Sequence, residues 1–162
     1  MNFITRTPVL WTLFVLTIAL TVAFGAAAPM VGGQFLDMVS APEDTRAVFD
    51  AMTPSERSMH FWLTIFLDTA YPFSFGLFFA GMAWRFFGKW GPFAAIPGFA
   101  VLIVDLTENM LQAITLSGAA YVLEPKAWVS PLKMNLFYAA ALIALVAAGI
   151  ALYRLFTKKK QA

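Results

Sequence analysis

The stretch from Ala100 to Ser117, AVLIVDLTENMLQAITLS, decides both the fold and the candidate site. It is apolar enough to cross a bilayer, yet it also carries Asp105, Glu108, Asn109 and Gln112. These four residues stand at i, i+3, i+4 and i+7, so they share one face of a helix. Ionisable side chains inside a membrane segment indicate a functional site by default. The stretch therefore predicts a membrane span with a polar site inside it.

The composition is that of an integral membrane protein rather than of a soluble domain. Of the 162 residues, 60% are hydrophobic and 12% are charged. Four apolar runs each reach the roughly 20 residues that a helix needs to cross the hydrocarbon core. We predict a single domain, residues 1–162: an all-α integral membrane protein with four transmembrane helices in an antiparallel bundle. The predicted helices cover about residues 8–28, 60–87, 93–117 and 131–156.

The first apolar run has a second interpretation. Arg6 precedes it and the small residues AAAP end it, which is also the signature of a cleaved signal peptide. The run is long for a signal peptide, and this favours a membrane span.

The loop of residues 31–59 carries two similar helix-start patterns, SAPE at residues 40–43 and TPSE at residues 53–56. Each places a hydroxyl at the N-cap and a glutamate three residues later, as in a capping box. The first pattern predicts a short helix that ends at about Met52. The second predicts the lead-in to the second span, so we expect an ordered extracytoplasmic loop with a short helix.

The second span combines a polar stripe with a proline. His60, Thr64, Asp68 and Tyr71 follow one another at helical spacing. Pro72 has no N–H to donate to the carbonyl four residues earlier, so the backbone oxygen of Asp68 should lack its helical donor. A free carbonyl and a carboxylate are therefore predicted at one residue.

In the fourth span, Ser130 and Pro131 predict an N-cap and a first helical residue. Asn135 and Tyr138 would then lie at the level of the site. Residues 118–129 are assigned to an outer loop, so no lysine or arginine is expected at the depth of the acids, although Lys133 is close enough to reach down.

Charge sets the predicted orientation. The two ends and residues 85–92 between the second and third spans carry seven bases and no acids, whereas residues 31–59 carry a net charge of −3. The positive-inside rule then puts both termini in the cytoplasm. We favour a bacterial inner membrane; in a eukaryote, the last four residues, KKQA, would read as a retrieval signal for the endoplasmic reticulum membrane.

Helix rise puts Asp68 and Glu108 at one depth, roughly 12 to 14 Å below the outer boundary. Each ionised acid at the centre of a membrane helix costs about 2.5 to 3.5 kcal/mol, so Asp68, Asp105 and Glu108 cannot all be ionised alone. They should share protons, bind a cation, or hold a basic or hydroxylated ligand. We expect a polar cup that opens outward, with Gln34 and Asp37 at its mouth and a phenylalanine-rich floor below.

The sequence contains no motif for thiol, metal or phosphate chemistry. The chain has no cysteine, which excludes thiol catalysis and thiolate metal sites. A carboxylate metal site of the di-iron type usually takes a histidine from each of several helices, whereas this chain has one histidine. No phosphate-binding loop, nucleophile elbow or zinc motif occurs. We predict no metal, no cofactor and no nucleic-acid partner. The acids could also serve only to fix helix register as neutral hydrogen-bonding groups.

The plan of four spans, an outer cap and membrane-depth acids resembles that of the sterol-isomerase and sigma-2-receptor group, as a likeness of plan without a shared motif. That resemblance implies acids that face an apolar amine or a sterol. The predicted site residues are Asp68, Asp105, Glu108, Asn109, Gln112, Tyr71, His60, Thr64, Tyr138 and Asn135. No catalytic residue is assigned among them.

The leading functional hypothesis is an intramembrane carboxylate site that binds protons or an apolar or amphiphilic ligand. The alternatives are a non-catalytic accessory subunit of a larger membrane complex, a lipid-isomerase-like enzyme with paired carboxylates, and a proton-coupled transporter. The partners expected are membrane lipids, a lipid-like or cationic amphiphilic ligand, and a second copy or a larger complex.

Overall fold

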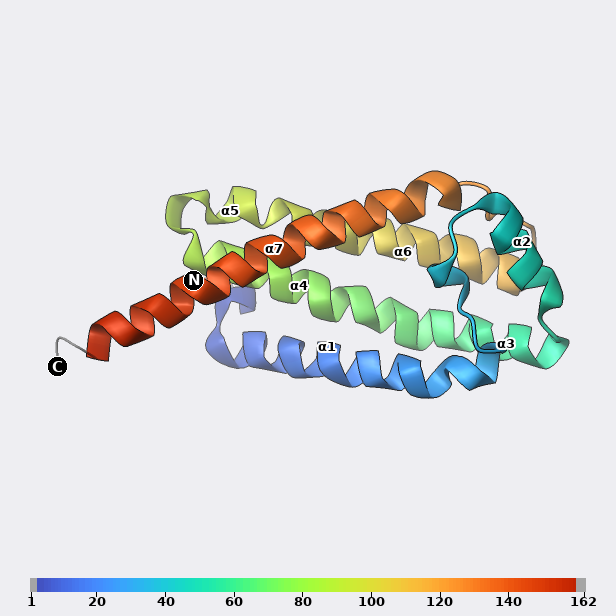
Figure 1. The fold of residues 1–162 in the computed structure, drawn as a ribbon, viewed down its shortest axis with the longest axis horizontal. Coiled ribbons are helices and arrows are strands. Elements are labelled where there is room, and N and C mark those ends of the chain that lie inside the picture. Colours follow the sequence, from blue (N-terminus) through green and yellow to red (C-terminus); the bar gives the residue numbers. More distant parts are fainter. Residues whose placement is uncertain (1–2, 160–162) are drawn as a thin grey trace.

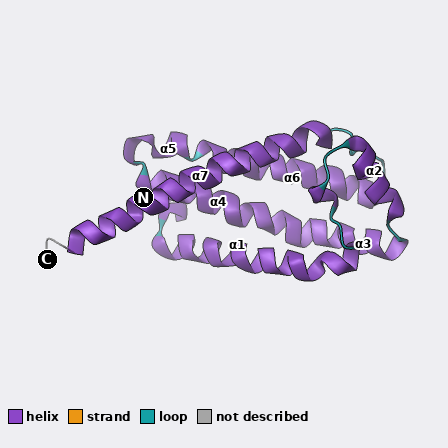
Figure 2. Ribbon diagram, viewed as in Figure 1, coloured by secondary structure: helices purple, strands orange, loops and turns teal. Residues whose placement is uncertain are grey.

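The computed structural model describes residues 3–159, and within that range it contains helices and no strand (Figure 2). The α-helices are α1 (Thr7–Ala27), α2 (Pro42–Ala51), α3 (Pro54–Leu63), α4 (Thr69–Phe86), α5 (Gly91–Ala94), α6 (Ile96–Leu116) and α7 (Lys126–Lys159). Short 3₁₀ turns and one π-helical turn, Thr64–Asp68, join them. Residues 160–162, which include the last lysine of the tail and most of the retrieval pattern, lie outside the described residues.

Four helical segments are long and apolar enough to cross a membrane. They are Thr7–Val31, Pro54–Phe86, Gly88–Leu116 and Lys126–Thr157. The predictions of an all-helical protein and of four such spans are confirmed, and the spans that begin at residues 54 and 126 start several residues earlier than predicted.

The long helices lie side by side along the long axis of the molecule (Figure 1). Helix α4 packs against α1, α6 and α7, and α6 also packs against α7. The short helix α2 covers one end of the bundle, beside the last turn of α6 and the first turn of α7 (Figure 1). The start of α1 and the last turns of α7 lie toward the opposite end of the bundle (Figure 1). The end with α2 is called the capped end below, and the opposite end the terminal end.

Glycines allow α4 and α6 to approach each other closely. A Cβ atom on Gly98 would lie 2.7 Å from the backbone nitrogen of Ala80, and one on Gly76 would lie 3.0 Å from the carbonyl oxygen of Gly98. Small residues of this kind let backbones pack in membrane helices, where lipid tails are as apolar as the side chains.

The second span changes its geometry at the predicted place. The π-helical turn, Thr64–Asp68, comes just before Pro72, and Thr69 donates its hydroxyl to the carbonyl of Thr64 at 3.0 Å. The side-chain amide of Asn109 donates to the backbone carbonyl of Asp68 at 2.9 Å. This confirms that the carbonyl of Asp68 takes its donor from outside the helix, as the proline requires.

The helix starts are partly as predicted. Thr53 and Glu56 form a reciprocal capping box at the start of α3. Helix α2 instead has Ala41 at its N-cap, and no side chain caps it, so the predicted cap at Ser40 is wrong. The predicted start of the last helix is also wrong, because α7 begins four residues before Ser130.

Candidate functional site

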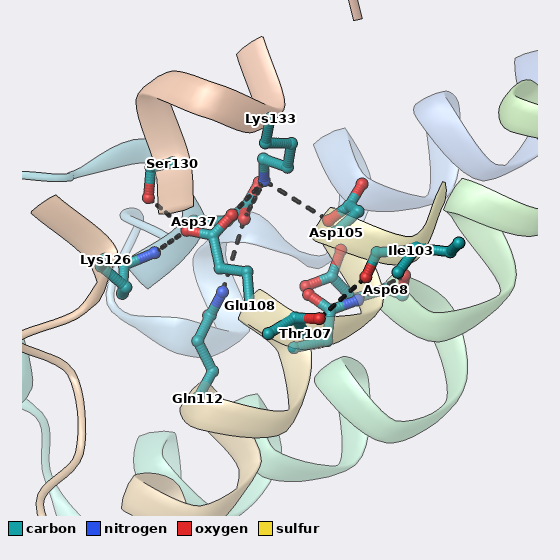
Figure 3. A network of polar contacts seen from close by, with 11 residues as sticks. Asp37, Asp68, Ile103, Asp105, Thr107, Glu108, Gln112, Lys126, Ser130 and Lys133 are labelled. Atoms are coloured by element: carbon teal, nitrogen blue, oxygen red, sulfur yellow. Dashed lines mark hydrogen bonds and ion pairs between the residues drawn. The ribbon is translucent and has the colours of Figure 1, made fainter. Parts of the chain in front are cut away.

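The side-chain amino group of Lys133 lies among three carboxylates, two from α6 and one from the loop before α2 (Figure 3). Its Nζ atom is 2.5 Å from Asp37, 2.7 Å from Glu108 and 3.4 Å from Asp105. Lys133 donates hydrogen bonds to Asp37 and Asp105, whereas its contact with Oε2 of Glu108 is an ion pair without hydrogen-bond geometry. Lys133 therefore links α7 to α6 and to the loop before α2.

Glu108 is held on both of its oxygens. Lys126 donates to Oε1, Ser130 donates to the same atom at 2.5 Å, and Lys133 pairs with Oε2. The side chains of Lys126 and Glu108 are both fully buried. Glu108 thus joins the first two turns of α7 to α6 through two lysines and a serine.

Sequence reasoning missed Lys126, which it placed in an outer loop, and it gave Ser130 the wrong role. A signal was present: Lys126, Ser130 and Lys133 stand at i, i+4 and i+7, the same spacing as the polar face of α6. Two such faces, one basic and one acidic, match when the helices pack against each other. The expectation that no lysine other than Lys133 reaches the acids is thereby corrected for Lys126, whereas Lys133 does reach down to them as anticipated.

Asp37 reaches the site from the short 3₁₀ turn Leu36–Met38, as predicted for the mouth of the site. Its side chain is 29% exposed, whereas that of Lys133 is 6% exposed. Burial by itself would raise the pKa of Asp37, but the ammonium groups of Lys133 and Lys126 bring it below its ordinary value of 3.8. Gln112 also donates to Asp37, at 3.4 Å.

Asp68 completes the acidic side of the site. It is 6% exposed, and within residues 3–159 its carboxylate forms no hydrogen bond and no ion pair. We call the following six residues the charged cluster: Asp37, Asp68, Asp105, Glu108, Lys126 and Lys133. With every group ionised, four negative charges would face two positive ones.

Several buried polar atoms beside the cluster have no hydrogen-bond partner in the described chain. They are His60 Nδ1, Thr64 Oγ1, Asn109 Oδ1 and Gln112 Oε1. All four residues are at most 3% exposed. Buried polar atoms of this kind are normally satisfied by ordered water or by a ligand. The side of α6 that faces α3 thus has unfilled hydrogen-bonding capacity.

Three other predicted site residues are not brought together with these. Tyr71 shares a hydrogen bond of 3.1 Å with Thr21 of α1. The amide of Asn135 is exposed and donates to the carbonyl four residues earlier, and Tyr138 is 61% exposed. The reason is helical geometry, since positions two and five residues after Lys133 point to other faces of α7.

Apolar layers close the site on two sides. The layer at the capped end consists of Leu36, Met52, Leu116 and Leu123. The layer toward the terminal end consists of Phe75, Val101 and Ala140, against which Phe79 and Phe137 pack. The site is therefore enclosed on these two sides, and Asp37 is the carboxylate of the cluster that stays partly exposed. Gln34 is exposed and borders a separate cavity of about 390 Å³.

A metal ion fits the site poorly as it stands. Asp37, Asp105 and Glu108 each offer an oxygen, and these atoms lie within 4.8 Å of one another. However, the amino group of Lys133 already stands among them, so a cation would have to displace it. The lysine supplies the positive charge that a metal would otherwise bring.

Four helices of membrane-spanning length and composition, together with this buried site, indicate a multi-pass membrane protein with an internal cluster of carboxylates and lysines. Comparison of the chain with protein-family models, curated proteins and solved structures gives no match. The function of the protein is therefore inferred from the site alone.

Proposed function

We propose that this protein takes up and releases protons at the charged cluster, from within an antiparallel bundle of four transmembrane helices. The capped end would face the outside of a bacterial inner membrane and both termini the cytoplasm, as the distribution of basic residues favours. Asp68 and Asp105 are the proton-binding groups of this proposal, and Glu108 is the partner of both lysines.

The observation that carries the proposal is the imbalance of charge in the cluster. Glu108 and Asp37 have close ammonium partners, which accounts for both lysines. Asp105 has only the longer contact of 3.4 Å to Lys133, and Asp68 has no ion pair within the described chain. A buried, uncompensated carboxylate is costly, and a proton removes that cost.

The same geometry supports a route for protons. Asp37 is the one carboxylate of the cluster that is partly exposed, and Lys133 joins it to Asp105. The unpartnered atoms of His60 and Gln112 are suited to hold water between the capped end and Asp68. Protons would thus exchange with the outer side, while the apolar layer under the cluster blocks the inner side.

The other hypotheses have less support. A cationic amphiphile would compete with the amino group of Lys133 for the same carboxylates. The lipid-isomerase, accessory-subunit and proton-coupled transporter hypotheses stay predictions from the sequence, and no contact in the described chain favours one of them.

Infrared spectroscopy of the reconstituted protein tests the proposal, because protonated carboxyl groups have a C=O band apart from the amide and carboxylate bands. We expect a protonated carboxyl band at neutral pH that weakens reversibly as the pH rises. Asp68→Asn and Asp105→Asn should each remove part of it, while Asp50→Asn, at an exposed residue of α2, should leave it unchanged. A band that is absent, or that does not change over the whole pH range in which the protein stays folded, would overturn the proposal.

A further inference from the structure

A groove of about 770 Å³ lies at the terminal end, between α1, α4 and α7. Its wall is mainly apolar and includes Leu10, Phe14, Phe78, Met82 and Ala151. Helices α1 and α7 both pack on α4, and the groove runs along α4 between them. The groove shares no residue with the charged cluster, and of its three helices only α7 contains residues of the cluster.

Two arginines border this apolar groove, and both are exposed. The guanidinium carbon of Arg85 lies 5.3 Å from the ring centre of Phe86, and that of Arg154 lies 5.9 Å from the same ring centre. Arg85 also donates to the hydroxyl of Thr7 at 2.8 Å and to the carbonyl of Thr5 at 3.1 Å. Neutral groups thus hold both guanidinium groups beside one aromatic ring.

Within the described residues, no acidic side chain compensates the positive charge of the two arginines. Neither arginine forms an ion pair within residues 3–159. The sequence explains why, since residues 1–36, 69–104 and 125–162 contain no aspartate or glutamate. An apolar groove with two guanidinium groups that lack an acidic partner at its edge is complementary to an amphiphile with a negative headgroup, and a guanidinium often binds phosphate in bidentate fashion.

We propose that the groove binds one anionic phospholipid, with its headgroup phosphate between Arg85 and Arg154 and an acyl chain along α4. The occupant follows from position as well as from charge. If the four helices span the bilayer, these arginines stand at the terminal-end boundary, where headgroups lie, and basic pockets between transmembrane helices bind anionic headgroups there. The inference rests on membrane spanning and not on proton binding.

Native mass spectrometry of the purified protein tests the site, with phosphatidylglycerol and phosphatidylcholine of matched acyl chains added in equal amounts. We expect the wild-type protein to retain phosphatidylglycerol preferentially. Each arginine should contribute about fivefold and the pair about thirtyfold to this preference. Arg85→Gln/Arg154→Gln should abolish it, whereas Lys89→Gln, which removes an exposed base of the same end outside the groove, should retain it.

A second variant tests the groove itself and leaves both arginines in place. Ala151→Phe fills the groove and should lower the amount of bound lipid severalfold, while Ala139→Phe, at an exposed alanine of α7 outside the groove, should not. Equal retention of the two lipids by the wild-type protein, or an undiminished preference in the double arginine variant, would overturn the proposal. None of these variants should alter the carboxyl infrared band, so this test fails or succeeds independently of the proton hypothesis.

Discussion

Lys126 and Glu108 form an ion pair whose two side chains are both entirely buried, and the pair joins the first turn of α7 to the middle of α6. Loss of one partner from such a pair leaves a buried charge without compensation, which costs about 3–5 kcal/mol. Loss of both partners removes the charges together. The pair therefore predicts strong coupling between two residues that stand 18 positions apart.

We expect Glu108→Gln and Lys126→Met each to lower the free energy of unfolding by about 3–5 kcal/mol. The double variant should lose clearly less than the sum of the two. Unfolding in mild detergent, followed by circular dichroism, measures all three. Glu124→Gln is the matched control, because Glu124 is 61% exposed and its ion pair with Arg46 is long, at 3.8 Å. Loss of such an exposed pair should cost less than about 1 kcal/mol. Additive effects of the two buried substitutions would contradict the assigned pair.

The same result bears on any assay of Glu108. A variant at this residue that loses activity would also lose stability, so activity must be compared at temperatures where both proteins are folded. Loss of function in Glu108→Gln alone is therefore not a clean test of catalysis.

Asp37 predicts a pH dependence of stability. Its pKa is below the ordinary value of 3.8, so its ionised form is favoured in the folded protein, and Asp37 stabilises the fold fully above pH 3.8. That stabilisation is lost as the pH falls below 3.8 through the pKa of the folded state. We expect Asp37→Asn to cost about 1.5–3 kcal/mol at neutral pH. The difference between variant and wild type should shrink below pH 3.8 in denaturation series from pH 7 to pH 3, and a constant difference would count against the Lys133 contact.

The sequence predicted those features that depend on local spacing. Helical periodicity alone brings together the buried side chains of Asp105, Glu108, Asn109 and Gln112. The missing N–H of Pro72 was enough to predict an unusual backbone near Asp68. Both inferences need only the geometry of one helix, which the order of residues determines.

Features that depend on how distant segments pack were predicted less completely. Lys126 is the first residue of α7, directly after Pro125, and its side chain is fully buried against Glu108 of α6, a contact that local spacing does not show. Asn135 and Tyr138 were placed by depth alone, which says nothing about the face of the helix. Depth along a span follows from sequence, whereas rotation about the helix axis follows from its neighbours.

The hydrogen bond from Asn109 to the carbonyl of Asp68 predicts a dependence on Pro72. Asn109→Leu leaves that buried carbonyl without a donor and should cost about 1–3 kcal/mol. In a Pro72→Ala background, the new N–H of residue 72 can donate to the same carbonyl, so the cost of Asn109→Leu should fall below about 1 kcal/mol. A thermal-unfolding cycle of the four proteins measures the difference. An equal cost in the two backgrounds would show that Asn109 does not serve this carbonyl.

The two helix-start patterns of the loop predict opposite outcomes for similar substitutions. Thr53 accepts a hydrogen bond from the backbone N–H of Glu56, so Thr53→Ala should lower stability by about 0.5–2 kcal/mol. Ser40 caps no helix, so Ser40→Ala should change stability by less than about 0.5 kcal/mol. Unfolding of the two variants under one condition compares them directly. A larger loss at Ser40 than at Thr53 would reverse the assignment of the caps.

The contact between α4 and α6 holds Asp68 opposite Asp105, and Gly98 sets how close these helices come. Gly98→Ala would put a Cβ atom 2.7 Å from the backbone nitrogen of Ala80, and since a backbone atom cannot rotate away, the helices must separate. We expect a loss of about 1–3 kcal/mol. Gly149→Ala is the control, because nothing lies within 4 Å of the added Cβ, and alanine should stabilise α7 by up to about 1 kcal/mol. Thermal unfolding in detergent should therefore shift in opposite directions for the two variants, and equal shifts would mean that the close approach of α4 and α6 does not occur.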